Sequence, residues 1–237
     1  MITLLFTLEY PPFKGGVANY YGNMVRYWPK IASVHLGLEE DDPDTKLRVL
    51  HNNDGALLWN WFYPKWLPST WLLKGAVNRQ SVEHIIVGHI LPLGTVTYNL
   101  NRKTGIPYTV ILHGMDLAMA MRPGRKQMIA KRVLLGATNI ICGNTYTAEL
   151  ALKHMGDKIR SKIFVVNPGI NPSFVVKKEK VDHIKRQYNL ENKTVLFSCG
   201  RLQKRKGFEN VIKVMPDINK DYPDLHYFIA GDGRRKM

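Results

Sequence analysis

The stretch Gly200-Arg201-Leu202-Gln203-Lys204-Arg205-Lys206-Gly207 is the part of this sequence that decides the fold. The apolar run Val195–Phe197 precedes it, and an amphipathic run from Phe208 to Met215 follows it. This order predicts a strand, a short basic loop and a helix. Open α/β folds bind their ligands in such loops, at the carboxyl edge of a parallel sheet. Cations beside a helix N-terminus predict a diphosphate site, but a solvated basic loop would have the same composition.

Strand-like apolar runs alternate with helix-like stretches over most of the chain. The strands are expected at 2–8, 33–38, 47–50, 84–89, 108–113, 139–142 and 162–166, from 194, and at 225–230. The helices are expected at 17–28, 92–103, 123–135, 145–155 and 175–188, and from 208. Alternation with short turns predicts parallel βαβ units. The expected fold class is therefore α/β, with a Rossmann-like, doubly wound parallel sheet.

Prolines and a glycine at 167–172 interrupt this alternation and predict a connection between domains. We expect a Rossmann-like N-terminal domain over 1–172, a linker over 173–192, and the incomplete start of a second Rossmann-like domain over 193–237. The last part contains a single βαβ unit, which cannot bury a core of its own. It therefore packs on the first domain, pairs with another chain, or belongs to a longer protein.

The composition indicates a globular protein that meets an anionic partner. Of the 237 residues, 45% are hydrophobic and 22% are charged, which is enough apolar material for a core. The 34 Lys and Arg exceed the 19 Asp and Glu, and the net charge is +15. Nucleic acid, anionic lipid headgroups or a phosphorylated small molecule would fit this charge. Cys142 and Cys199 each follow an apolar run, so both are expected to be buried thiols.

The sequence shows neither a signal-peptide pattern nor an apolar run of transmembrane length. We therefore expect a cytoplasmic protein, with membrane contact only at its surface. Segment 56–73 contains four of the five tryptophans, and basic residues recur over 122–132. Aromatic rings favour the membrane interface and cations favour anionic lipids. Core packing of the tryptophans and a solvated helix face are the alternatives.

Six motifs follow one another along the chain in a characteristic order. They are Glu9-Tyr10-Pro11-Pro12 with Gly15-Gly16-Val17 and Tyr20, His113-Gly114-Met115-Asp116, Ile140-Ile141-Cys142-Gly143-Asn144, Val166-Asn167-Pro168-Gly169-Ile170-Asn171 with Phe174, Gly200-Arg201-Leu202 with Lys206-Gly207, and Ile229-Ala230-Gly231-Asp232-Gly233. In this order the chain resembles the GT-B-fold retaining glycosyltransferases of family 4. That family carries an acidic E-x7-E motif further along its C-terminal domain. This sequence ends before the position of that motif. The resemblance therefore implies a truncated C-terminal domain.

The resemblance implies transfer of a sugar, with retention, from a UDP- or GDP-linked donor to a glycan or lipid-linked acceptor. It assigns Arg201 and Lys206 to the leaving diphosphate, where a guanidinium fork and a point charge can replace a metal. Gly15 and Gly16 would let main-chain amides approach the same phosphates, although an ordinary turn would also use them. His113 would lie beside the donor sugar, and a satisfied core histidine is its alternative.

Two further residues, His89 and Asp116, are acceptor-side candidates. His89 ends a strand-like run, and Asp116 is also expected to cap the helix that follows it. The carboxylates at 41–44 lie in a polar loop and are expected to be solvated. We therefore predict no metal site and no cofactor other than the nucleotide-sugar substrate.

Two other functions remain open. A catalytically incomplete partner subunit would need a second chain to complete its C-terminal domain. A basic nucleic-acid-binding protein would fit the net charge, but the sequence has no recognisable nucleic-acid-binding signature. We therefore expect no specific nucleic acid partner.

Overall fold

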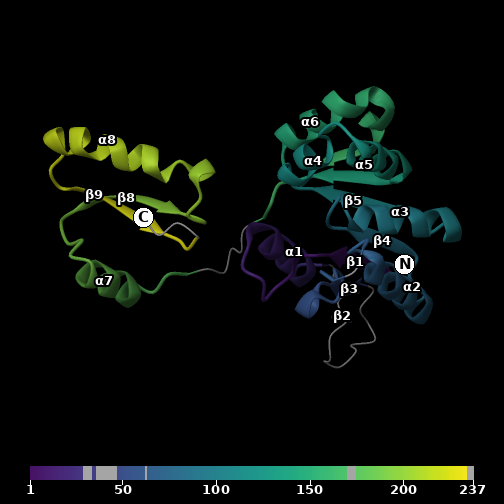
Figure 1. The fold of residues 1–237 in the computed structure, drawn as a ribbon. Coiled ribbons are helices and arrows are strands. Elements are labelled where there is room, and N and C mark those ends of the chain that lie inside the picture. Colours follow the sequence, from purple (N-terminus) through teal and green to yellow (C-terminus); the bar gives the residue numbers. More distant parts are fainter. Residues whose placement is uncertain (29–33, 36–46, 62, 170–174, 234–237) are drawn as a thin grey trace. The chain divides into compact units, whose positions relative to one another are not determined.

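The structure is a computed structural model that describes residues 1–28, 34–35, 47–61, 63–169 and 175–233. The chain divides into two compact units, Met1–Asn171 and Pro172–Met237 (Figure 1). The predicted acidic loop at 39–44 lies outside the described residues, as does most of the expected strand at 33–38. Each unit is an α/β arrangement.

The first unit is built on a seven-stranded sheet in which every neighbouring pair is parallel. The strands are β1 (Thr3–Thr7), β2 (Val34–His35), β3 (Leu47–His51), β4 (His84–Val87), β5 (Tyr108–Leu112), β6 (Asn139–Cys142) and β7 (Ile163–Val165). Their spatial order is β2-β3-β1-β4-β5-β6-β7. The order therefore reverses beside β1, because β3 pairs with one side of β1 and β4 with the other. Open parallel sheets bind ligands at such a reversal.

Helices cover both faces of this sheet. They are α1 (Gly16–Arg26), α2 (Leu67–Gln80), α3 (Leu93–Thr104), α4 (Met115–Ala120), α5 (Arg125–Gly136) and α6 (Thr145–Met155), with short 3-10 helices at Asn53–Gly55 and Gly156–Lys162. Leu4 and Phe6 of β1 join the core formed with α2 to α6, whereas Leu5 joins the core under α1. This alternation follows the two-residue period of a strand. All of β1 is buried, because both of its faces are covered.

The second unit pairs β8 (Thr194–Cys199) in parallel with β9 (Leu225–Ala230). Around this pair lie α7 (Lys178–Gln187), a 3-10 turn at Lys204–Lys206, and α8 (Phe208–Asp221). Most of β8 is exposed, and its apolar residues include Phe197. Within the described part of this unit, Leu190 and Phe208 are the buried hydrophobic residues. The unit therefore has far less core than the first.

The expected strands and helices are confirmed wherever the structure describes them, apart from shifts at their ends. Helix α2 was not predicted, and α4 was expected only as the helix that Asp116 would cap, without bounds. The expectation that both cysteines are buried is wrong for Cys199, which is exposed, and right for Cys142. Cys142 lies on β6 between two other strands. Cys199 lies on β8, which pairs only with β9 among the described strands.

Replacing Phe6 by alanine should remove a fully buried ring from β1, an interior strand of the sheet. We expect the free energy of unfolding to fall by about 3–5 kcal/mol, because the lost apolar contacts leave a cavity. Urea denaturation measures this change. The Phe13→Ala variant is the control, since Phe13 is an exposed ring of the same unit and its loss should change stability by less than about 0.5 kcal/mol. Equal losses in the two variants would contradict this core assignment.

Candidate active site

The carboxyl ends of three neighbouring strands bring the candidate residues of the first unit together. Glu9 follows β1, His89 follows β4 and His113 follows β5. The strands are in parallel register, with Phe6 opposite Val87 and Val87 opposite Val110. All three strands therefore end at the same edge of the sheet, at the reversal of strand order. Helix α1 covers this region and contributes Tyr20 and Tyr21.

A buried hydroxyl joins two of these strand ends. Tyr21 is fully buried, and its Oη lies 2.7 Å from the carbonyl oxygen of Gly88 and 2.7 Å from Nε2 of His113. A carbonyl only accepts hydrogen bonds, so the one phenolic proton goes to Gly88. Nε2–H of His113 must then donate to Tyr21. In the neutral imidazole this leaves the lone pair on Nδ1.

The electrostatic environment keeps both rings of this pair uncharged. Burial raises the pKa of Tyr21 well above its usual value, and the carboxylate of Asp116 adds to the rise. Burial also lowers the pKa of His113, and nearby His89 lowers it further, against opposite effects from Asp116 and Glu9. The Tyr21 hydroxyl therefore keeps its proton, and His113 is neutral near pH 7. The rings of Tyr20 and Tyr21 meet that of His113 edge to face, at centroid distances of 5.4 Å and 5.3 Å.

Gly88 is required for the Tyr21 contact. A Cβ atom at this position would lie 2.7 Å from the Tyr21 hydroxyl oxygen and 2.7 Å from Oγ1 of Thr7. Carbon and oxygen atoms without a hydrogen bond cannot approach so closely without displacing one another. The glycine after β4 therefore permits the hydroxyl to reach the main-chain carbonyl.

Asp116 holds the main chain of His113 in place. Its Oδ1 accepts a hydrogen bond of 2.9 Å from the His113 backbone N–H. The expectation that Asp116 caps the next helix is wrong, because Gly114 is the N-cap of α4 and Asp116 lies in the first turn. The carboxylate reaches back to the preceding residue instead. Its Oδ2 is buried and has no hydrogen-bond partner among the described residues.

His89 lies next to this cluster, and its ring centroid is 6.4 Å from that of His113. The backbone N–H of Leu8 donates to Nδ1 of His89 over 3.4 Å, so the proton of the neutral ring is on Nε2. That nitrogen lies 3.9 Å from Oε1 of Glu9. The structure thus gathers His89, His113 and Asp116 at one sheet edge, together with Glu9.

Gly15 and Gly16 lie at the start of α1, the helix that carries Tyr20 and Tyr21. Gly15 is the N-cap, has extended backbone and offers no side-chain cap. The first turn of α1 contains no acidic residue, so its amide dipoles have no carboxylate beside them in the same turn. A Cβ atom at Gly16 would meet no heavy atom within 4 Å. The fold of this unit alone therefore does not require glycine at Gly16.

The basic loop of the second unit lies against the end of β9. The N–H of Gly200 donates to Ala230 over 2.9 Å, and that of Leu202 donates to Asp232 over 2.9 Å. A Cβ atom at Gly231 would collide with the carbonyl oxygen of Gly200. The two glycine-containing motifs therefore form one packed structure, although about thirty residues separate them in the sequence.

The two predicted phosphate ligands, Arg201 and Lys206, are exposed residues of this loop. Gly207, with φ of 73°, is the N-cap of α8 and ends the loop in the left-handed region. A Cβ atom at Gly200 would lie 3.8 Å from Cε of Lys206, so the lysine side chain folds back over the start of the loop. Nε of Arg205 donates to Gln203 within the loop over 3.0 Å.

Sequence reasoning did not identify Tyr21, Gly88 or Glu9 as site residues. Tyr21 has the helical spacing of an ordinary core residue, and the separation of 67 residues between Tyr21 and Gly88 hides their contact. Only the alignment of strand ends reveals it. Among the described residues, no group of three or more His, Cys, Asp and Glu side chains is arranged to hold a metal ion.

Two family patterns match this sequence. Glycosyltransferase Family 4 matches residues 14–174, which is more than half of the 237 residues, and Glycosyl transferases group 1 matches residues 180–237. The chain belongs to Glycosyltransferase Family 4. The family that the six motifs indicated is thereby confirmed.

Two curated relatives match nearly the whole chain, each at 22% identity. One is the GDP-mannose-dependent alpha-(1-6)-phosphatidylinositol monomannoside mannosyltransferase of Mycolicibacterium smegmatis. The other is the GDP-mannose-dependent monoacylated alpha-(1-6)-phosphatidylinositol monomannoside mannosyltransferase of Corynebacterium glutamicum. The matches cover 97% and 98% of this chain, but only 60% and 61% of the relatives.

Solved structures with the same fold include Anabaena Alr3699/HepE in complex with UDP-glucose. It has a TM-score of 0.70 at 14% identity, and the match covers 98% of this chain and 61% of that chain. A sucrose-phosphate synthase from Thermosynechococcus elongatus has a TM-score of 0.64 at 14% identity, covering 97% of this chain and 62% of the other. At such identities the likeness concerns the fold alone. The predicted fold class, α/β of the GT-B type, is confirmed.

Replacing Tyr21 by phenylalanine should remove the hydrogen bond that fixes the proton of His113 on Nε2. The variant leaves the Gly88 carbonyl and Nε2 of His113 without their shared partner, so stability should fall by about 1–3 kcal/mol. Imidazole 15N NMR should show Nε2–H as the main tautomer in the parent protein and a mixture in the variant. Tyr20→Phe is the control, because Tyr20 contacts the same ring by its edge. An unchanged tautomer in Tyr21→Phe would contradict the proposed donor assignment.

Stability should fall as the pH drops below about 6.5, the usual pKa of histidine. Burial lowers the pKa of His113 in the folded state, so the unfolded state binds protons first and is favoured as pH falls. Burial lowers the pKa of His84 in the same direction. Urea denaturation between pH 7.5 and 5 should therefore show a smaller loss for His113→Asn than for the parent protein. Parallel curves would contradict the pKa direction of His113.

Proposed function

We propose that this chain is part of a retaining, metal-independent glycosyltransferase that takes its sugar from a UDP- or GDP-linked donor. Membership of family 4 supports the reaction class. The observation that carries the proposal for the site is the cluster at the reversal of strand order. There, His113 is held in one tautomer by Tyr21 and through its main chain by Asp116. A neutral, fixed imidazole with a free Nδ1 lone pair can accept a hydrogen bond from a sugar hydroxyl.

Arg201 and Lys206 would stabilise the leaving diphosphate. Negative charge builds on that group as the bond to the anomeric carbon breaks, and fixed cations can stabilise it as a metal would. Both side chains are exposed on a loop that ends at the N-terminus of α8. The glycines at 200 and 207 shape this loop, and the motif at 231–233 packs against it. Gly15 and Gly16 would offer the amides of the α1 N-terminus to a phosphate group of the donor.

Asp116 and His89 would act on the acceptor side. The buried Oδ2 of Asp116 lacks a partner in the described part of the chain, so an acceptor hydroxyl that reached it would supply the missing hydrogen bond. His89 lies beside the same cluster. A glycan or lipid-linked acceptor is our proposal, and the two relatives named as phosphatidylinositol monomannoside mannosyltransferases support a lipid-linked one.

Contact with an anionic membrane surface belongs to this proposal. The exposed fractions of Trp61, Tyr63 and Trp71 are 77%, 89% and 58%, so these rings are not part of the core. Trp59 stacks on Trp61 at a centroid distance of 4.9 Å, which forms an aromatic surface. Amphipathic rings of this kind favour the membrane interface. None of the helices that the structure describes is long and apolar enough to cross a bilayer.

A second candidate function is a partner subunit that acts together with another chain. The exposed apolar residues of β8, Val195, Leu196 and Phe197, support it, because such a strand is normally covered. In that case the chain would bind nucleotide without turning over the sugar donor. Addition of the partner chain would then restore turnover.

Replacing Arg201 and Lys206 together by alanine tests the diphosphate site. We expect at least about tenfold weaker binding of UDP or GDP, since charge-assisted hydrogen bonds contribute about 1.5–3 kcal/mol each. Calorimetric titration measures binding, and release of UDP or GDP from the sugar donors measures turnover. Lys204→Ala with Arg205→Ala is the matched control, because it removes two charges from the same loop. Equal effects of the two pairs would contradict the assignment to Arg201 and Lys206.

A further inference from the structure

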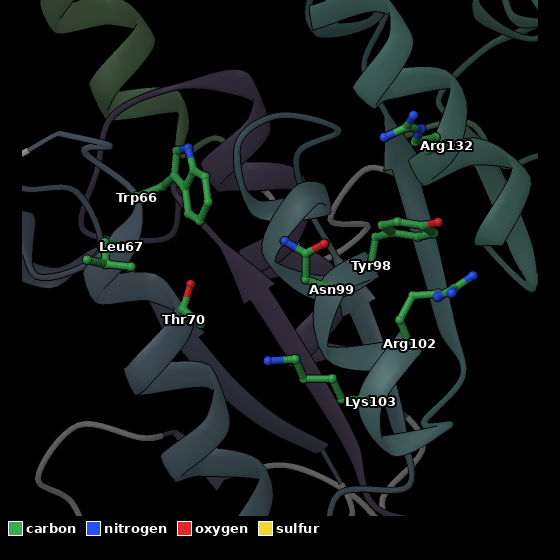
Figure 2. A pocket seen from close by; sticks show the side chains of 8 residues that line it. All are labelled: Trp66, Leu67, Thr70, Tyr98, Asn99, Arg102, Lys103 and Arg132. Atoms are coloured by element: carbon green, nitrogen blue, oxygen red, sulfur yellow. The ribbon is translucent and has the colours of Figure 1, made fainter.

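A hollow on the helical layer of the first unit lies apart from the candidate active site. It has a volume of about 480 Å³, within the range of small-molecule sites. Its lining comes from the start of α2, the second half of α3 and the middle of α5 (Figure 2). The lining residues are Trp66, Leu67, Thr70, Tyr98, Asn99, Arg102, Lys103 and Arg132. None of them belongs to the cluster around His113.

The charge of this hollow is entirely positive. Arg102, Lys103 and Arg132 line it, and the lining includes no carboxylate. Among the described residues, none of these three cations takes part in an ion pair. Because like charges repel, three unneutralised cations around one hollow favour an anion between them.

Helix stability explains only part of this arrangement. Arg102 and Lys103 lie in the last turn of α3, where cations interact favourably with the helix dipole. Arg132 lies within α5, whose last turn contains no basic residue. The helix dipole therefore does not account for Arg132.

The remaining lining residues suit an anion that carries an uncharged portion. Figure 2 shows Lys103 and Asn99 on the side of α3 that faces Thr70, and Tyr98 and Arg102 on the side that faces Arg132. Donors thus approach from both flanks of α3. Guanidinium groups offer paired donors to phosphate oxygens, and the asparagine amide offers another. Trp66 and Leu67 form an apolar wall.

Thr70 adds an independent sign of an unfilled site. Its Oγ1 is shielded from solvent and has no hydrogen-bond partner in the part of the chain that the structure describes. A buried hydroxyl without a partner costs free energy. Thr70 itself lines the hollow, so this unpaired hydroxyl belongs to its wall.

We propose that this hollow binds a phosphoryl group, carried either by a lipid headgroup or by a free phosphorylated compound. A planar Arg donor pairs with two phosphate oxygens, and a Lys adds a point charge. The site is separate from the donor diphosphate site, and it does not depend on sugar transfer. The ligand would contact residues of α2, α3 and α5, all of which belong to the first unit.

The test compares two double variants of the full chain with the same loss of charge. Arg102→Ala with Arg132→Ala removes two cations of the hollow. Lys153→Ala with Lys158→Ala removes two exposed cations elsewhere in the same unit. All four side chains are exposed, so both variants should fold, which circular dichroism and thermal unfolding check. The probes are inorganic phosphate, followed by NMR of the Trp66 indole N–H, and sedimentation with vesicles of phosphatidylcholine containing phosphatidylglycerol.

The two sources of the phosphoryl group give different outcomes. For a lipid headgroup, the hollow variant should bind the anionic vesicles at least tenfold more weakly than the control variant. For a free compound, phosphate should shift the Trp66 signal in the parent and the control but not in the hollow variant, while vesicle binding stays equal. Equal behaviour of the two variants toward both probes would overturn the proposal. Binding of UDP or GDP should be the same in both variants, which separates this result from the test of the donor site.

Discussion

The candidate site depends on one buried hydroxyl. The Oη of Tyr21 lies between the Gly88 carbonyl and the His113 imidazole, at 2.7 Å from each. This single group connects α1 with the ends of β4 and β5, and it decides which nitrogen of His113 carries the proton. The arrangement requires the absence of a side chain at Gly88, because a Cβ atom there would collide with the hydroxyl. Packing and proton position are therefore set by the same contact.

The two units differ in how far their candidate residues are buried. In the first, a parallel sheet covered on both faces holds the strand ends rigidly, and the low polarity favours the neutral forms of Tyr21 and His113. In the second, the cations of the basic loop stay exposed to solvent, where an anion can reach them. Main-chain hydrogen bonds between 200–202 and 230–232 shape that loop instead of a core. A neutral site beside the sugar and a charged site for the diphosphate are what transfer from a nucleotide sugar would require.

The cations of this protein form two groups with different surroundings. Cations of the basic loop would meet the donor, whereas those of α3 and α5 surround a hollow on the helical layer. The exposed rings of Trp61 and Trp71 belong to the segment that leads into α2 and to α2 itself. Aromatic residues and cations therefore occur together around α2 and α3. The excess of cations can thus form two separate anion sites, each with different surrounding residues and a different ligand.

The sequence by itself determined the alternation of strands and helices, and hence the α/β class, because apolar periodicity is a local property of the chain. Six ordered motifs also identified the family and named His113, Arg201 and Lys206. Only the tertiary structure revealed the Tyr21 bridge, the role of Asp116 as a support for the main chain of His113, and the exposure of Cys199. Each depends on which segments lie side by side. A side chain that serves a distant strand end has the same sequence spacing as any core residue, so its partner is decided only when the strands are aligned in the sheet.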